Sequence, residues 1–188
     1  MKVTELSIPG LRVIEPDVRA DGRGTLTELW HEPRHADAGI ASRFVQQNMS
    51  RSRPGVLRGL HVQHPNAQAK LISVLGGEIF DVAVDVRRGS PTFGRWDSVI
   101  LSARNGRQLW IPEGFAHGFC VTGDSAIVLY QLSACHDPAA ELTIAWNDPA
   151  LAIAWPVRRP VLSDRDRLAP TLAEINPALL PPYAGGAA

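Results

Sequence analysis

The stretch EIFDVAVDV at residues 78–86 limits the fold of this chain more than any other feature. Apolar side chains at every second position alternate with two aspartates and an alanine, and this period of two is typical of a β-strand. The apolar members are Phe80, Val82, Val84 and Val86, and the others are Asp81, Ala83 and Asp85. The pattern predicts a strand with one face on the core and one polar face.

Other short apolar runs are spaced along the chain and separated by turn-forming residues. Besides 78–86, we expect strands at 25–30, 69–75, 97–101, 107–111, 117–121 and 125–132. Turns are expected at 76–77, 87–94, 103–106, 112–115 and 123–124. The 16 glycines and 15 prolines recur throughout, which favours many short strands. This regular spacing predicts an all-β fold, either an antiparallel sandwich or a barrel.

Helical signals are few. Residues 33–41 could form a short helix. A second candidate at 163–175 begins with Ser163, and Asp166 follows three residues later, as in a capping box. Pro170 would interrupt this helix, because proline cannot continue the backbone hydrogen-bond pattern.

Length and composition limit the functional classes. The 188 residues suit a single domain over 1–188, and we expect its tail at 176–188 to be irregular and frayed. Since 19 Lys and Arg balance 19 Asp and Glu, nothing indicates binding to nucleic acid or a membrane. The start of the chain lacks a signal peptide's apolar core, and Cys120 and Cys135 are too few for a disulfide framework. We therefore expect a cytoplasmic, reduced protein.

The stretch LRGLHVQHPNAQAK at 57–70 raises the question of a metal site. His61, His64 and His117 could supply three imidazole ligands. However, side chains on one face of a strand are two residues apart, and the position two after His61 is Gln63, a poor ligand for transition metals. An ammonium group close to the cation, from Lys70, would also be unfavourable. We therefore expect no metal here.

A histidine base needs fewer partners than a metal site. His61 is the candidate base, and Asp166 or Asp81 could fix its tautomer. Lys70 could stabilise a developing oxyanion. Tyr130 stands on an otherwise apolar predicted strand and could supply an acid.

Purely structural explanations stand beside these roles. His61 could be a hydrogen-bonded histidine of the core or rim, Asp166 could only cap a helix, and Tyr130 could be a core aromatic. His117 follows PEGFA and could simply close a turn.

Three charged residues and one glycine have similar alternatives. Arg23 and Glu28 flank the first predicted strand and would ordinarily be solvated. In a regular strand Arg58 and His61 would face opposite sides. They can share a site only if Gly59 allows a β-bulge.

An ordered set of motifs resembles one known family. The stretches are DGRGTLTELW (21–30), FVQQNMSRS (44–52), GVLRGLHVQHPNAQAKL (55–71), GEIFDVAVDVRRGSPTFGRW (77–96), NGRQLWIPEGFAHGF (105–119), WNDP (146–149) and LSDRDRLAP (162–170). Together they cover about 8–175, and the chain resembles the dTDP-4-dehydrorhamnose 3,5-epimerases of the cupin superfamily. The resemblance implies a jelly-roll β-sandwich or barrel with a few short helices, a homodimer, a substrate in the barrel mouth, and no metal or other cofactor.

The resemblance also implies roles for individual residues. His61 matches the proton-abstracting base, Asp166 its carboxylate partner, Tyr130 the acid on the opposite face, and Lys70 the lysine beside the keto oxygen. The positions that match residues holding the sugar and diphosphate are Arg23, Glu28, Gln46, Asn48, Arg58, His117, Glu141 and Arg165.

The implied reaction explains these residue types. In dTDP-4-dehydro-6-deoxy-D-glucose, the C4 carbonyl acidifies the hydrogens on C3 and C5. A base removes one of them, and the resulting enolate is stabilised by a cation in a desolvated pocket. Reprotonation from the other face inverts the centre, and inversion at both centres gives dTDP-4-dehydro-L-rhamnose. Arginine side chains suit the diphosphate because they bind its oxygens through two parallel hydrogen bonds.

The chain departs from the family pattern at four positions. A lysine is usual where Arg165 stands, an aromatic residue where Leu26 stands, a tyrosine where His136 stands, and a lysine where Gln131 follows the tyrosine. These changes surround the substrate, so a 3- or 5-mono-epimerase of a related sugar nucleotide stays an alternative. A metal-dependent cupin and a non-catalytic sugar-nucleotide binder are alternatives of other classes.

Overall fold

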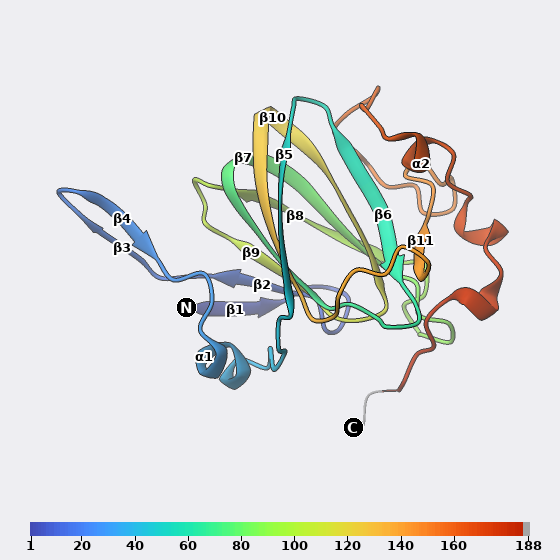
Figure 1. The fold of residues 1–188 in the computed structure, drawn as a ribbon, viewed down its shortest axis with the longest axis horizontal. Coiled ribbons are helices and arrows are strands. Elements are labelled where there is room, and N and C mark those ends of the chain that lie inside the picture. Colours follow the sequence, from blue (N-terminus) through green and yellow to red (C-terminus); the bar gives the residue numbers. More distant parts are fainter. Residues whose placement is uncertain (186–188) are drawn as a thin grey trace.

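The computed structural model describes residues 1–185 and consists mainly of antiparallel strands (Figure 1). The strands are β1 (Lys2–Glu5), β2 (Arg12–Glu15), β3 (Val18–Asp21), β4 (Gly24–Thr27), β5 (Gln46–Ser52), β6 (Leu57–Gln63), β7 (Lys70–Asp85), β8 (Trp96–Ser102), β9 (Gln108–Ile111), β10 (Phe115–Leu132) and β11 (Glu141–Thr143). The helices are α1 (Glu32–Asp37) and α2 (Asp164–Arg167), with 3₁₀ turns η1 (Leu172–Glu174) and η2 (Pro177–Leu179). The all-β jelly-roll prediction is confirmed.

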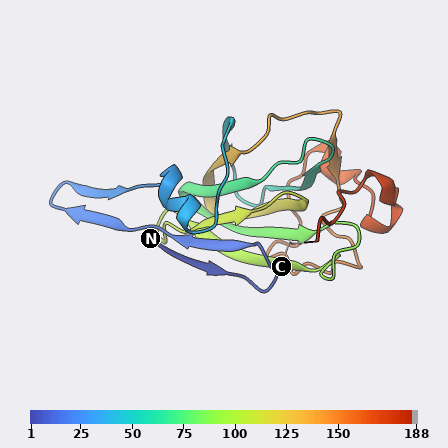
Figure 2. The same ribbon diagram turned by 90° about the horizontal axis from the view of Figure 1, so that it is seen from below.

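Two long strands organise the main sheet. Its order is β1-β2-β9-β7-β10-β6-β11, with β5 paired to β10 and β8 paired to β7. A separate hairpin, β3–β4, projects away from this body in two views (Figures 1 and 2). Because β7 and β10 each pair with several neighbours, their side chains can meet groups from distant parts of the sequence.

The turns predicted at 76–77 and 123–124 were wrong. Strands β7 and β10 run through both positions, with shifts in their mutual register there. Gly77 explains the first error, because a Cβ at this residue would lie 1.7 Å from the Ser125 carbonyl oxygen. The glycine therefore permits a close approach of two backbones within a bulged ladder. Glycine is typical of such bulges inside strands as well as of turns.

Several strands escaped prediction. Strand β5 has the sequence QQNMSRS, and most of its residues are exposed because it pairs with β10 alone at a sheet edge. Strand β6 was not predicted, and the predicted strand at 25–30 is only the short β4 of the hairpin. The predicted helix at 33–41 appears as the shorter α1. The predicted helix at 163–175 ends at Arg167, and Pro170 separates α2 from η1 as expected.

The alternation at 78–86 is confirmed, but both faces of this segment are buried. Val82 and Val84 pack into a core cluster with residues of the C-terminal segment. Asp81 and Asp85 lie on the other face and are 0% exposed. The polar side of the strand therefore points into the protein, where each carboxylate requires a partner.

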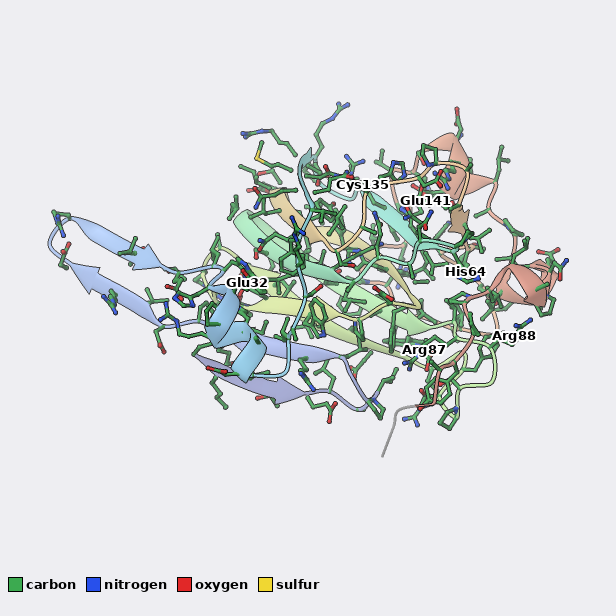
Figure 3. All side chains as sticks on the ribbon, turned by 60° about the horizontal axis from the view of Figure 1, so that its bottom comes forward. Glu32, His64, Arg87, Arg88, Cys135 and Glu141 are labelled. Atoms are coloured by element: carbon green, nitrogen blue, oxygen red, sulfur yellow. The ribbon has the colours of Figure 1, made fainter. Side chains whose placement is uncertain are left out.

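The tail does not fray at its start, contrary to expectation. Leu180 is buried in the same core cluster as Val82. Arg88 N donates to Pro181 O at 2.8 Å, and Tyr183 N donates to Arg88 O at 3.0 Å. The Arg87 guanidinium stacks on the Tyr183 ring at 5.0 Å, and Arg87 and Arg88 lie beside this segment in Figure 3. Of the predicted tail, 186–188 lies outside the described residues.

Within residues 1–185, no helix combines the length and apolar character that crossing a membrane requires.

A β-bulge at Gly59 lets Arg58 and His61 face the same site, as expected from the sequence. His61 pairs with His117 and Arg58 pairs with Phe119, so β6 has one residue more than β10 between these pairs. Gly59 has φ of +115°, and a Cβ there would lie 2.6 Å from both Gly118 Cα and the His117 carbonyl oxygen. The bulge therefore depends on a residue without a side chain.

We predict that Gly59→Ala lowers the free energy of unfolding by about 2–4 kcal/mol, because backbone strain and a steric clash add. Urea denaturation measures this change. Gly123→Ala is the matched control, since a Cβ at Gly123 meets nothing within 4 Å. Equal stability of the two variants would contradict the explanation.

Candidate active site

A cavity of about 620 Å³ opens between β5, β6 and the ends of β7 and β10. Nine of the residues proposed from the sequence line it, namely Asn48, Arg58, His61, Lys70, His117, Tyr130, Glu141, Arg165 and Asp166. They come from positions as far apart as β5 and α2, so the fold gathers groups that the sequence separates by more than a hundred residues.

His61 and Asp166 form a direct pair. His61 Nε2 lies 2.7 Å from Asp166 Oδ1, and Asp166 is 4% exposed. Ser163 Oγ donates to Asp166 Oδ2 at 2.7 Å and accepts from Asp166 N at 3.1 Å. Burial would raise the pKa of Asp166, but the hydrogen bonds from His61 and Ser163 outweigh it and lower the pKa. The carboxylate therefore stays ionised and fixes the imidazole ring.

Lys70 is a buried cation at the start of β7. Its Nζ donates to the His61 carbonyl oxygen at 3.4 Å. Burial lowers the pKa of Lys70 to about 8, although Glu141 and Asp81 favour the charged form. The ammonium is thus mostly charged at neutral pH, in surroundings where a nearby oxyanion would interact with it strongly.

Tyr130 lies on β10, and its hydroxyl is 3.0 Å from Ser50 Oγ on β5. Burial raises the pKa of Tyr130 to about 12, and the Ser50 hydrogen bond only partly opposes this. The phenol is therefore protonated at neutral pH and can donate a proton. Its ring centroid is 6.4 Å from that of His117, which lines the same cavity.

A second histidine–carboxylate pair involves His117. Its Nε2 lies 2.5 Å from Asp81 Oδ1, and both residues are buried. Asp81 was considered as an alternative partner for His61, and this was wrong because Asp166 occupies that place. The polar face of β7 thus supplies the group that orients His117.

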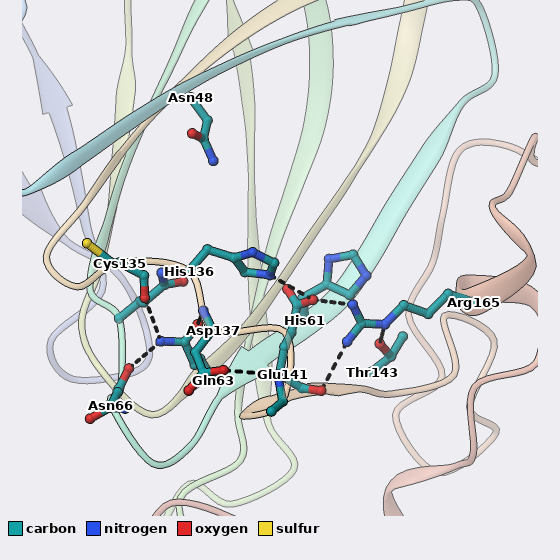
Figure 4. Close-up of polar contacts among 12 residues, drawn as sticks. Asn48, His61, Gln63, Asn66, Cys135, His136, Asp137, Glu141, Thr143 and Arg165 are labelled. Atoms are coloured by element: carbon teal, nitrogen blue, oxygen red, sulfur yellow. Dashed lines mark hydrogen bonds and ion pairs between the residues drawn. The ribbon is translucent and has the colours of Figure 1, made fainter.

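A cluster of polar side chains stands at the rim of the cavity (Figure 4). Arg165 Nη1 pairs with Glu141 Oε2, and Arg165 Nε donates to Thr143 Oγ1 at 2.7 Å. His136 Nε2 lies 3.3 Å from the same Glu141 oxygen. Burial would raise the pKa of Glu141, but His61, His136 and Arg165 lower it overall. His136 and Arg165, which both depart from the family pattern, therefore contact the same carboxylate of Glu141.

Three proposed residues are not brought into the cavity of the single chain. Gln46 does not line the cavity, and its Nε2 donates to Asn48 Oδ1 at 3.1 Å. Arg23 lies at the exposed hairpin turn and pairs with Asp21, while Glu28 pairs with Arg34. Of the residues that the structure describes, neither Arg23 nor Glu28 is among those lining the cavity.

Sequence reasoning missed supporting residues of the site. Ser50 holds Tyr130, Gln68 lines the cavity, and Ser163 was identified only as a helix cap. Alternation could have found two of them, because Ser50 stands two residues after Asn48 and Gln68 two residues before Lys70.

The three-histidine set considered for a metal is not assembled. His61 and His117 line the cavity, but His64 lies beyond the end of β6 and is not part of the lining. Over residues 1–185, no group of three or more His, Cys, Asp or Glu side chains has an arrangement suited to a metal ion.

We predict that Lys70→Met raises the free energy of unfolding at pH 7 by up to about 3 kcal/mol, because it removes a buried charge. The folded chain binds fewer protons than the unfolded chain between about pH 8 and pH 10.5, so the lysine's penalty falls as pH rises through this range. Urea denaturation at pH 7 and pH 10.5 should give a gain that vanishes at the higher pH. Lys2→Met, at an exposed site, is the control, and a loss of stability at pH 7 would refute the argument.

Comparison with known proteins gives a consistent result. Residues 5–174 match the sequence model of the family described as dTDP-4-dehydrorhamnose 3,5-epimerase. A Neisseria gonorrhoeae protein of that name is 48% identical over 96% of this chain, which spans only 55% of that relative. A dTDP-4-dehydrorhamnose 3-epimerase of Streptomyces niveus is 44% identical, covering 98% of this chain and 90% of the relative.

Among solved structures, the 3,5-epimerase of Legionella pneumophila in complex with dTDP-4-keto-L-rhamnose is similar throughout. Its TM-score is 0.96 at 48% identity, over 98% of this chain and 99% of that one. Sequence and structure therefore agree that this chain belongs to the dTDP-4-dehydrorhamnose 3,5-epimerase family.

Proposed function

We propose that the protein inverts C3 and C5 of dTDP-4-dehydro-6-deoxy-D-glucose and releases dTDP-4-dehydro-L-rhamnose. One observation carries the proposal, namely that the His61–Asp166 pair, Lys70 and Tyr130 line one cavity. A Legionella relative of similar fold is in complex with dTDP-4-keto-L-rhamnose, which supports this substrate class. We propose a single epimerase domain, with its core at about 8–175.

His61 acts as the base in this proposal. Its pairing with Asp166 fixes the ring and stabilises the imidazolium that forms when a proton leaves C3 or C5. The electron pair moves to the C4 oxygen and gives an enolate. Lys70 is suited to stabilise that negative charge, because its ammonium is buried close to the backbone of His61.

Tyr130 returns a proton on the other face of the sugar ring. Its pKa of about 12 keeps the hydroxyl protonated at neutral pH, and Ser50 holds the oxygen in place. Base and acid stand on different strands, β6 and β10, which suits transfer from two directions. No redox cofactor is needed, because the carbonyl at C4 is restored when each proton returns.

The diphosphate would be held by cationic and polar side chains of the lining. Arg58, His117 and Asn48 are available in the chain, and Arg165 stands at the rim. Arginine suits this role because its planar guanidinium binds two oxygens at once.

Inversion at C3 alone is the second candidate. The Streptomyces niveus relative, at 44% identity over nearly the whole chain, is named a 3-epimerase. The His61–Asp166 pair and Tyr130 suit either outcome, because both reactions need a base and an acid on opposite faces. The two candidates differ in how many centres exchange protons.

We further propose a homodimer in the cytoplasm. The β3–β4 hairpin projects from the body (Figures 1 and 2) and exposes Leu26 and Val18. Arg23 lies between β3 and β4 and does not line its own chain's cavity. A second copy that packs against this hairpin would bury these apolar side chains and could receive Arg23 and Glu28 in its site.

Both cysteines are free, which agrees with a reducing compartment such as the cytoplasm.

Proton NMR of dTDP-4-keto-6-deoxyglucose with the protein in deuterated water tests the reaction. We expect the signals at C3 and C5 both to be lost. His61→Asn should lower the exchange rate by about 10²–10⁴-fold, and Tyr130→Phe should slow inversion more than it weakens binding.

Other outcomes have clear meanings. Loss of the C3 signal alone would make the protein a 3-epimerase. Binding without any exchange would indicate a non-catalytic binder and would refute the proposed reaction. Exchange at the wild-type rate in His61→Asn would remove His61 as the base.

Mixing two inactive variants tests the shared site. If Arg23 of one protomer enters its partner's cavity, Arg23→Ala and His61→Asn homodimers should regain activity after subunit exchange. Hybrid dimers then contain one site with both groups intact, so about a quarter of the sites should recover. No recovery, with hybrid dimers verified by mass spectrometry, would place Arg23 outside the partner's site.

A further inference from the structure

The segment 134–137 follows β10 and brings His136 to the cavity. Its backbone is held by glutamine side chains from three places in the fold. Gln68 Nε2 donates to Ala134 O at 2.8 Å, Gln63 Nε2 donates to Cys135 O at 3.1 Å, His136 N donates to Gln46 Oε1 at 2.8 Å, and Asp137 N donates to Gln63 Oε1 at 2.8 Å. The position of this segment therefore depends on side-chain amides.

Gln63 makes the central contribution to this arrangement. It is 2% exposed, and its Nε2 also donates to Asn66 O at 2.5 Å. Its amide thus joins the turn after β6 to the segment that carries His136 (Figure 4). A side chain that only accepts, or only donates, could not make this set of bonds, because Asp137 N requires an acceptor and two carbonyls require donors.

The place of Gln63 in the sheet links this clamp to the site. Gln63 stands two residues after His61 on β6, and it pairs in the ladder with Glu141 on β11. Glu141 in turn accepts from His136 at the rim. The backbone that carries the histidine base therefore also sets where His136 stands.

The groups proposed for proton transfer have other supports. Asp166 is held by Ser163, and Tyr130 is held by Ser50. Neither contact involves the segment 134–137. A change at Gln63 should therefore move the rim of the cavity and leave the reacting groups in place.

We propose that Gln63 is a positioning residue for the sugar-nucleotide site. It acts through His136, which it fixes against Glu141 at the mouth of the cavity, and it sets the affinity for the nucleotide sugar more than the rate of proton transfer. This inference rests on the proposed epimerase function.

Gln63→Met keeps the length of the side chain and removes every bond of the amide. We expect KM for the dTDP-linked 4-keto sugar to rise about tenfold, with kcat within threefold of wild type. Amide deuterium exchange in peptides that cover 135–137 should become at least tenfold faster. Gln108→Met is the matched control, because it removes a buried amide on β9 that also donates two hydrogen bonds but does not line the cavity, and it should change neither quantity.

A double-mutant cycle tests whether Gln63 acts through His136. The rise in KM from Gln63→Met and that from His136→Ala should not multiply in the combined variant, because both remove the same contact. Independent effects, unchanged exchange at 135–137, or a parallel fall in kcat with constant KM would each overturn the proposal. If wild type turns over no substrate, the proposed function fails, while the exchange measurement still decides whether Gln63 holds the segment.

Discussion

The antiparallel pairing of β7 with β10 is the contact on which the rest of the molecule depends. The ladder runs from Phe115 opposite Asp85 to Leu132 opposite Lys70, with bulges on the way. It fixes His117 and Tyr130 on one strand relative to Lys70 and Asp81 on the other. The other site elements attach to this pair, since β5 and β6 both pair with β10. A shift in this register would therefore move Lys70 and Asp81 relative to His117 and Tyr130.

Charge burial is the cost of this arrangement. Lys70 and Asp81 are buried on the same strand, and each is offset by groups from another element. Lys70 is buried at the wall of the cavity, so its interaction with a negative charge there would be stronger than on the surface. The same burial destabilises the folded chain, so Lys70 opposes stability although the proposed reaction depends on its charge.

Local pattern was sufficient for part of the fold. The alternation at 78–86 identified its strand, because a period of two appears even when both faces are buried. The Gly76–Gly77 pair misled, because a glycine that permits a bulge looks the same in sequence as one that permits a turn. Strand β5 carries mostly polar residues, since an edge strand needs little apolar surface, and so it gave no signal.

Many residues that line the cavity could be named from the sequence, but which side chains contact one another could not. His61 and Asp166 are 105 residues apart, and only the fold decides that Asp166, rather than Asp81, reaches the imidazole. The family resemblance named both residues, whereas the residues alone left the choice open. Arg23 could not be placed from spacing, because its position depends on a hairpin that leaves the body of its own chain.

The order in which the site is completed along the chain has a biosynthetic consequence. The barrel strands, with His61, Lys70 and Tyr130, are all translated before α2, and Asp166 arrives on the segment that then covers the outer face of β7. A chain released by the ribosome before α2 would contain most of the sheet but would lack the Asp166 carboxylate that holds the His61 imidazole. If the proposed roles hold, such a chain should be far less active than one that includes α2, because its imidazole would no longer be fixed by a carboxylate.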